Sequence, residues 1–543
     1  MATDNKYDRQ LRLWGGSGQK ALMEANILLV NASATGTETL KNLVLPGVGR
    51  FTILDAENVR ALDQGSNFFV GPEHVGLPKA KARTRRKGRL RSAYVTMELL
   101  CEMNPDVKGE YVQEDPDSKM NKDPAFFSKF SLVIASQLHE ATLRKMAGLC
   151  WDNAVPFLHV RSYGLLGHVR LALKGHCVVE SKPEGNRPDL RISQPWPELL
   201  EYCRSIDLDK QDSMLHGHTP WIVILVKKME EWKAAHGGLL PSFQERKAFQ
   251  QSLKAAARDY QKELNYQEAF KESYVAYASP GLSPEVETLL ASAETMEVKE
   301  GSKSSNFWLL ARALGEFVKG EGGGLPPLSG EVPDMTSDTD SFITLQGLYK
   351  AKAAKDTAAV AALVDEGLAR DDRPKGSVPK EETEIFCKNA RKLLTMTTRP
   401  VEEEYGSSSC NKDEISCELG DPYEVPEQTP MVWYLALRAA DAFKTSNGRY
   451  PGEEDDQVEG DGEALWKIMQ ELLKEMGVET NLLSEKHAQE IARYGASELH
   501  NVASVVGGIA SQEAVKAVTR QYTPLDNTIV YNGLAGVIGR YEL

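Results

Sequence analysis

Up to about residue 175, short apolar runs alternate with segments of helical periodicity. Apolar runs at residues 27–30 and 51–54 flank a segment in which Leu40, Leu43 and Val44 recur at helical spacing. Strands that alternate with helices indicate an α/β domain with a doubly wound, mostly parallel sheet. Further runs of strand length follow at residues 130–135, 155–160 and 169–173.

From about residue 195, long amphipathic helices replace this alternation. Three of them resemble one another: they open at Trp221, Trp308 and Trp433, carry a second aromatic residue further along, and end in glycine followed by proline. Glycine at a helix end and proline just beyond it are ordinary stop signals. We expect a mainly helical domain in which these aromatic residues form the core.

After residue 490 the α/β character returns. Residues 501–518 predict a helix and residues 528–531 a last strand. Gly507 and Gly508 inside that helix each cost about 1 kcal/mol relative to alanine. We therefore expect this helix to approach another backbone closely.

The predicted organisation is one α/β domain interrupted by a large insertion. Residues 1–175 form its first part, residues 176–484 form the inserted helical domain, and residues 485–543 complete the α/β domain.

The segment at residues 27–58 has the layout of a nucleotide-binding βαβ start. In such a unit the phosphates sit at the helix N-terminus, and an acid at the end of the second strand meets a ribose. Asp55 takes the place of that acid, but the turn before the helix has lost most of its glycines. This pattern indicates a nucleotide site that has been filled in.

Composition and charge limit which kinds of partner and which cellular compartment we expect. The chain of 543 residues has a net charge of −14, no long apolar run and no apolar signal core at its N-terminus. We expect a cytoplasmic protein that binds neither nucleic acid nor membrane. The basic segment at residues 79–91 is read as a solvated loop, with nuclear import as the alternative.

The seven cysteines form no C-x-x-C pair. This argues against a zinc site or a disulfide framework and favours a reducing compartment. We expect no bound metal.

Several segments together resemble a known family. YDRQLRLWG, LKNLVLPGVG, ILDAENV and SELHNVASVVGGIASQEAVKAVT are similar to segments of the enzymes that activate ubiquitin-like proteins. Within that superfamily the chain most resembles the regulatory, non-cysteine subunits of the heterodimeric enzyme for the Nedd/Rub modifier. HTPWIVI, FWLLARALGEFV and RYPG extend the resemblance over nearly the whole length, whereas residues 79–91 look like an insertion.

Active members of the superfamily hold ATP on a G-x-G-G-x-G loop. Only the last of the four glycine positions is glycine here: they are Asn31, Ser33, Ala34 and Gly36. The expected phosphate-binding arginine is absent from residues 66–69, and Ser136-Gln137 replaces the magnesium-binding aspartate. The resemblance thus implies no catalytic residue in this pocket and leaves Asp55 as a loop cap, with Asn31, Ser33 and Ala34 filling the phosphate space.

None of the seven cysteines lies in the proline-flanked Cys-Thr context of the family's catalytic cysteine. Cys177 is the only cysteine that follows a histidine, His176. Because neighbouring residues on a strand point to opposite faces, we do not expect these two side chains to form a catalytic pair. The resemblance therefore implies that a catalytic, cysteine-bearing subunit is the partner.

The resemblance also implies that this chain contributes a residue to the partner's active site across the interface between the two subunits. In this superfamily the arginine of the D-R-Q segment reaches into the partner's ATP site, and this residue is Arg9, with Arg12 as a second candidate. A guanidinium stays charged and can donate several hydrogen bonds to phosphate. The alternative is a surface ion pair between Arg9 and Asp8 or Glu24. ATP and magnesium would then lie in the partner's site, and the modifier would be a further partner.

Residues 333–346 (PDMTSDTDSFITLQ) resemble a family region that contacts the catalytic subunit. The alternative is plain linker and helix structure. The predicted contact residues are Pro333, Asp334, Met335, Phe342, Ile343, Leu345 and Gln346.

The leading hypothesis is a non-catalytic regulatory subunit that supports ATP-dependent adenylation and thioester formation by its partner. A self-sufficient adenylating enzyme and an NAD-binding oxidoreductase are the alternatives. The incomplete glycine loop argues against both.

Overall fold

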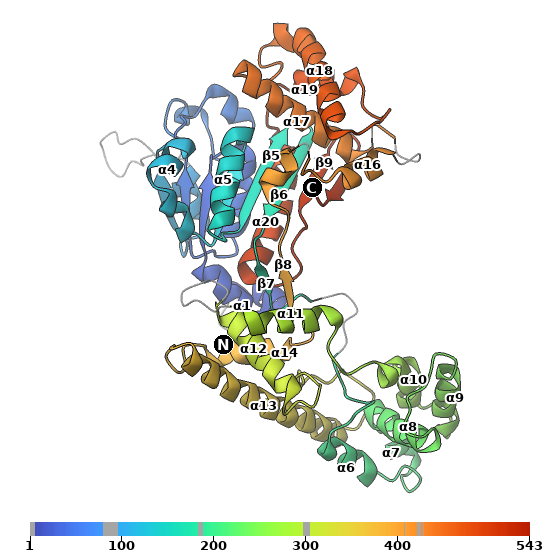
Figure 1. Cartoon of the computed structure of the whole chain (residues 1–543). Helices are drawn as coiled ribbons and strands as arrows, with labels where there is room; N and C mark the ends of the chain where they lie inside the picture. The colour runs from blue at the N-terminus through green and yellow to red at the C-terminus, as the bar shows by residue number, and fades with distance from the viewer. Residues whose placement is uncertain are drawn as a thin grey trace. The chain divides into compact units, whose positions relative to one another are not determined.

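The computed structural model describes residues 6–79, 96–182, 188–296, 305–406, 408–420, 425–426 and 428–543. The chain divides into two compact units (Figure 1). The first unit joins Met1–His176 to Thr395–Leu543, and the second is Cys177–Leu394. β7 (His176–Val178) and β8 (Leu394–Met396) lie where the chain passes from one unit to the other. Apart from Lys79, the basic segment at residues 79–91 lies outside the described residues.

The first unit is built on one twisted sheet with the strand order β10-β9-β6-β5-β4-β1-β2-β3. β3, β2, β1, β4 and β5 run parallel, and β6, β9 and β10 continue the sheet with antiparallel pairings. The predicted mostly parallel sheet is thus confirmed. The strands are β1 (Asn26–Val30), β2 (Arg50–Leu54), β3 (Lys108–Val112), β4 (Leu132–Ser136), β5 (Phe157–Tyr163), β6 (Leu166–Ala172), β9 (Thr528–Asn532) and β10 (Val537–Tyr541).

Helices cover both faces of this sheet. Because side chains alternate along a strand, Ile27 and Leu29 enter one core and Leu28 and Val30 the other. The described helices of this unit are α1 (Asp8–Glu24), α2 (Ala34–Val44), α3 (Thr96–Met103), α4 (Pro116–Lys122), α5 (Glu140–Asp152), α15 (Val401–Tyr405), α16 (Lys412–Gly420), α17 (Pro430–Asn447), α18 (Val458–Met476), α19 (Glu485–Tyr494) and α20 (His500–Thr519), with short 3₁₀ turns at Ala61–Gly65, Pro72–His74, Pro124–Lys129 and Asp455–Gln457.

α2 and α20 pack closely on the first of these faces. A Cβ atom on Gly507 would lie 2.9 Å from the backbone nitrogen of Thr39 and 2.9 Å from the Cβ of Glu38, whereas Gly508 faces open space. The predicted close backbone approach is confirmed, and Gly507 is the residue that requires it.

The second unit is helical and has two apolar cores. One gathers around Trp221 and Ile224 of α8, the other around Phe307 and Phe317 of α12. Its described helices are α6 (Pro197–Ser205), α7 (Ser213–Gly217), α8 (Trp221–Ala235), α9 (Arg246–Ala256), α10 (Leu264–Lys271), a 3₁₀ turn at Ser273–Tyr277, α11 (Pro284–Thr295), α12 (Ser305–Lys319), α13 (Thr339–Arg370) and α14 (Lys380–Lys388).

The second domain boundary differs from the expected one. The chain returns to the first unit at Thr395 and not at residue 485. The reason is α17, whose Trp433 and Phe443 are buried, as expected for core, but in one cluster with Tyr163 and Val530 of the sheet. The three similar helices therefore serve three different cores. Helical periodicity shows that a face is apolar but does not show what will cover it.

None of the helices among the described residues is long and apolar enough to span a bilayer.

Candidate functional site

The turn after β1 is tied to the end of β4. Asn31 has a φ of +64°, and its Nδ2 donates to the carbonyl oxygen of Ser136 at 3.0 Å. Ser33 caps α2 by accepting from the amide of Gly36 at 3.1 Å, and its hydroxyl also meets that of Ser136. A Cβ on Gly36 would lie 2.8 Å from the Cβ of Ser136. The one retained glycine thus serves close packing against β4.

Asp55 caps the loop, as the sequence analysis expects. Its Oδ2 accepts from the amide of Ala32 at 2.7 Å, and its Oδ1 accepts from the amide of Glu57 at 2.7 Å. Burial raises the pKa of this carboxyl, and these two backbone bonds oppose the rise. Both oxygens are therefore committed to the loop rather than to a ribose.

A carboxylate from a remote part of the chain lies at the N-terminus of α2. Glu498 Oε2 accepts from the amide of Ala34 at 3.0 Å, and its Oε1 accepts from the amide of Thr35 at 3.0 Å. The hydroxyls of Thr35 and Ser162 donate to the same Oε1 at 2.8 and 3.2 Å. These backbone donors and the positive end of the helix dipole are the features that bind phosphate in nucleotide sites.

The pocket is therefore closed by a residue that the sequence analysis missed. Asn31 and Ser33 were expected to fill the phosphate space, but their side chains turn towards Ser136. The carboxylate of Glu498 takes the helix amides instead. Glu498 is visible in the SELHN segment of the sequence, but nothing in the local pattern relates it to the turn before α2, 463 residues away.

Asn67 and Gln137 lie in the segments where the family's phosphate-binding arginine and magnesium-binding aspartate are expected. Both side chains form hydrogen bonds within the fold. Asn67 is buried, accepts from the amide of Phe69 at 3.0 Å and donates to the carbonyl oxygen of Ala32 at 3.3 Å. Gln137 has a φ of +53° and donates to the carbonyl oxygen of Ser162 at 2.7 Å. Neither position offers a cation for phosphate or a carboxylate for magnesium.

Arg9 lies in the first turn of α1 and is exposed. Of its two expected surface partners, Asp8 pairs with Arg12 at 2.9 Å instead. Within the described part of the chain, the guanidinium of Arg9 joins no ion pair, whereas Arg12 has a partner.

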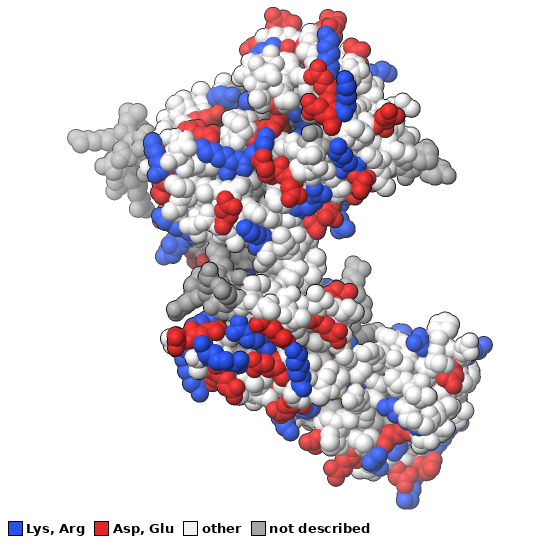
Figure 2. Space-filling view, viewed as in Figure 1, with Lys and Arg blue, Asp and Glu red and all other residues white. Residues whose placement is uncertain are grey.

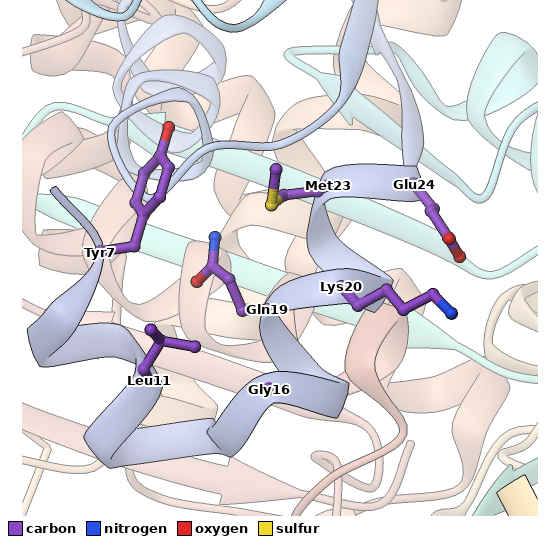
Figure 3. Close-up of a pocket in the computed structure, with 7 residues that line it drawn as sticks. All are labelled: Tyr7, Leu11, Gly16, Gln19, Lys20, Met23 and Glu24. Carbon is purple, nitrogen blue, oxygen red and sulfur yellow. The ribbon is translucent and has the colours of Figure 1, made fainter. Parts of the chain in front are cut away.

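α1 borders an open groove of about 550 Å³ (Figure 3). Tyr7 and Leu11 come from one side of a bend at Gly15, and Gln19 and Met23 come from the other. Gly16, Lys20 and Glu24 complete the lining. The groove lies on the same bent helix as Arg9.

The segment at residues 333–346 contains both buried and exposed side chains. Leu345 is fully buried in the core around α8, and Met335 packs against that core. Leu345 is therefore corrected from a partner anchor to a core residue of its own unit. Ile343 is 60% exposed, Asp334 is exposed, and Pro333, Phe342 and Gln346 are half-buried.

Most of the cysteines lack the exposure of a reactive thiol. Five of the seven are buried, including Cys177. Burial raises the pKa of Cys203 and of Cys387 to about 12. A nucleophilic cysteine needs the opposite shift.

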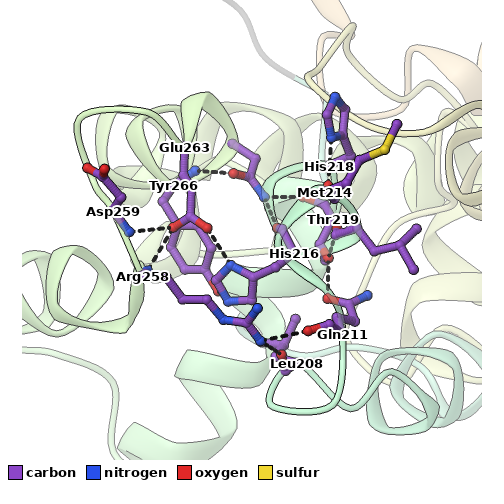
Figure 4. Close-up of polar contacts among 12 residues, drawn as sticks. Leu208, Gln211, Met214, His216, His218, Thr219, Arg258, Asp259, Glu263 and Tyr266 are labelled. Carbon is purple, nitrogen blue, oxygen red and sulfur yellow. Dashed lines mark hydrogen bonds and ion pairs between the residues drawn. The ribbon is translucent and has the colours of Figure 1, made fainter.

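His216, Glu263 and Tyr266 form a buried acid–histidine–tyrosine trio in the second unit (Figure 4). Nδ1 of His216 lies 2.6 Å from Glu263 Oε1, and its Nε2 lies 3.0 Å from the hydroxyl of Tyr266. Glu263 also accepts from the amide of Arg258 at 2.8 Å, and Asn265 donates to the carbonyl oxygen of His216. The side chains of this trio thus join α7 to α10.

The described surface carries charges of both signs. Figure 2 shows acidic and basic side chains interspersed over the visible face of each unit. On the described residues of that face, this mixture does not form the basic stripe typical of phosphate-backbone binding.

The chain is similar to known proteins over nearly all of its length. The model of the ThiF family matches residues 7–537. The NEDD8-activating enzyme E1 regulatory subunit of Xenopus laevis is 41% identical, and the match covers 99% of this chain and 98% of that protein. The Danio rerio protein of the same name is 39% identical over the same shares.

A plant relative extends the same match. The NEDD8-activating enzyme E1 regulatory subunit AXR1 of Arabidopsis thaliana is 41% identical, covering 97% of this chain and 94% of that protein. The chain belongs to the ThiF family and, within it, to the family of NEDD8-activating enzyme E1 regulatory subunits.

Proposed function

We propose that this chain is the non-catalytic regulatory subunit of a heterodimeric enzyme that activates the Nedd/Rub modifier. Its partner is a catalytic subunit that bears the reactive cysteine and adenylates the modifier. ATP and magnesium bind in the partner's site, and this chain binds neither alone.

One observation carries the proposal: the carboxylate of Glu498 lies on the amides of Ala34 and Thr35. A phosphate would have to displace this carboxylate and then meet its negative charge nearby. Asp55, the other candidate for nucleotide contact, is held by the backbone of its own loop. Both features argue against a self-sufficient adenylating enzyme and against an NAD-binding oxidoreductase.

Arg9 is the proposed contribution to the partner's chemistry. It is exposed, and its neighbour Arg12 already neutralises Asp8. A guanidinium at a transferring phosphate stabilises charge that develops in the transition state, so its removal lowers the rate more than the affinity. Exposed Ile343 is the side chain of the segment at residues 333–346 best suited to a partner contact.

The test uses the isolated chain and the reconstituted heterodimer. Isothermal titration of the chain alone with magnesium-ATP is expected to give no heat of binding. In the heterodimer, Arg9→Ala is expected to leave assembly intact and to slow formation of the modifier adenylate at least about tenfold. Pyrophosphate exchange by the isolated chain would overturn the proposal.

A further inference from the structure

The first two turns of α1 carry Arg9 and several other exposed side chains. Arg9, Arg12 and Leu13 are exposed, and the helix is interrupted at Gly15, where φ is +67°. A helix this short is marginal in water, where isolated helices need about 12–15 residues. Contacts at its two ends therefore contribute to its order.

Tyr7 makes the contacts at the N-terminal end. Its hydroxyl donates to Asp106 Oδ2 at 3.1 Å and accepts from Asn104 Nδ2 at 3.1 Å. Its ring lies against Gly47, where a Cβ atom would come within 2.7 Å of the Tyr7 hydroxyl and where φ is +90°. Gly47 is thus required both for its backbone conformation and for the space that Tyr7 occupies.

Of the two residues that receive the Tyr7 hydroxyl, Asn104 is fixed in the interior, whereas Asp106 is exposed. Asn104 is 1% exposed, and its Nδ2 also donates to the carbonyl oxygen of Val44 at 2.8 Å, at the end of α2. Asp106 pairs with Lys6 at 3.0 Å. Tyr7 is therefore connected to the helix whose other end Glu498 closes.

Trp14 makes the contacts at the C-terminal end. Its carbonyl oxygen accepts from Gln521 Nε2 at 3.0 Å, and its indole nitrogen donates to Gln19 Oε1 at 3.2 Å. Gln19 in turn donates to the carbonyl oxygen of Pro46 at 2.9 Å. Both ends of residues 8–14 are thus attached to the sheet domain, with Arg9 between them.

We infer that Tyr7 is a positioning residue: by anchoring the start of α1 on Gly47, Asn104 and Asp106 it presents Arg9 in one fixed direction. This inference rests on the proposed role of Arg9. Small errors in the placement of a charge-stabilising group have large effects on rate. The hydroxyl of Tyr7 should therefore matter to catalysis without touching substrate.

The experiment compares Tyr7→Phe, Arg9→Ala and the double variant in the reconstituted heterodimer. Tyr7→Phe is expected to lower the single-turnover rate of adenylate formation about 3–10-fold, with little change in KM for ATP. In the Arg9→Ala background the same change should have no further effect, because the presented group is gone. Amide exchange at residues 8–14 should speed up in Tyr7→Phe.

Tyr274→Phe is the matched control, since it also removes a hydroxyl bonded to a carboxylate, that of Glu272 at 3.0 Å in the second unit. It should leave the adenylation rate unchanged. A slowed Arg9→Ala variant with a normal Tyr7→Phe rate would overturn this inference alone. A normal rate in Arg9→Ala would overturn the proposed function as well. Additive losses in the double variant would reduce Tyr7 to a structural role and contradict the inference.

Discussion

Replacing Glu498 by alanine should destabilise the first unit, because the carboxylate is the acceptor for two buried amides. Ala34 is 2% exposed and Thr35 is fully buried, so their N–H groups have little access to water. Each unsatisfied buried donor costs about 1–3 kcal/mol. Glu498 itself is half-buried, so water can partly replace it, and we expect a total loss of about 2–4 kcal/mol.

Glutamine at the same position separates charge from hydrogen bonding. Glu498→Gln keeps one acceptor oxygen but loses the charge at the helix N-terminus and turns a donor towards one amide. The expected loss is about 1–2 kcal/mol. The predicted order of stability is therefore wild type, then glutamine, then alanine.

Urea unfolding followed by circular dichroism measures these differences if the slope m stays unchanged between variants. Glu490→Ala is the matched control, because Glu490 forms a salt bridge with Arg493 one turn away near the surface. That change should cost no more than about 1 kcal/mol. If Glu498→Ala were as stable as Glu490→Ala, the carboxylate would not be the group that satisfies the start of α2.

Three further outcomes follow from buried groups elsewhere. Gly507→Ala should lower the free energy of unfolding by about 1–3 kcal/mol, because the new Cβ meets the backbone of α2. Gly508→Ala should raise it by up to about 1 kcal/mol, because a Cβ there meets open space. Equal melting temperatures of the two variants would contradict this packing. Asp441→Ala should lower the free energy of unfolding in urea by about 3–5 kcal/mol, because it leaves the guanidinium of Arg161 buried without its partner at 2.8 Å. A loss under about 1 kcal/mol would contradict this prediction. Burial lowers the pKa of His168 to about 4, so the unfolded chain binds a proton below pH 6.5 that the folded chain does not. His168 should therefore contribute a loss of stability of about 1.4 kcal/mol for each unit that the pH falls from 6.5 towards 4, beside the contributions of buried His159 and His176, whose pKa values are lowered as well. His168→Gln should remove that share of the slope in urea titrations at several pH values, and an unchanged slope would contradict this reasoning.

Local patterns in the sequence predicted the features that depend on neighbours in the chain. The strand–helix alternation led to the parallel sheet, and an acid at the end of β2 led to the loop cap at Asp55. The close approach of α20 to another backbone was recognisable because glycine inside a helix needs a compensating contact, although the pattern did not distinguish Gly507 from Gly508.

Features that depend on distant parts of the chain were not predictable in the same way. Glu498 reaches α2 across 463 residues, and an isolated glutamate in a loop carries no sign of its acceptor role. α17 and α12 have the same apolar pattern, yet they enter different cores. Leu345 and Ile343 are equally apolar in sequence, but only the register of α13 decides that Leu345 is buried and Ile343 is exposed.

The central claim is that this chain acts through Arg9 in a partner's site and not through its own closed pocket. Single-turnover formation of the modifier adenylate by the reconstituted heterodimer tests it most directly, with wild type, Arg9→Ala and Arg540→Ala, an exposed arginine on β10, compared at saturating ATP. We predict that Arg9→Ala slows the reaction at least about tenfold while the heterodimer stays assembled and Arg540→Ala keeps the wild-type rate. Equal rates for all three, or adenylate formed by this chain alone, would contradict the account.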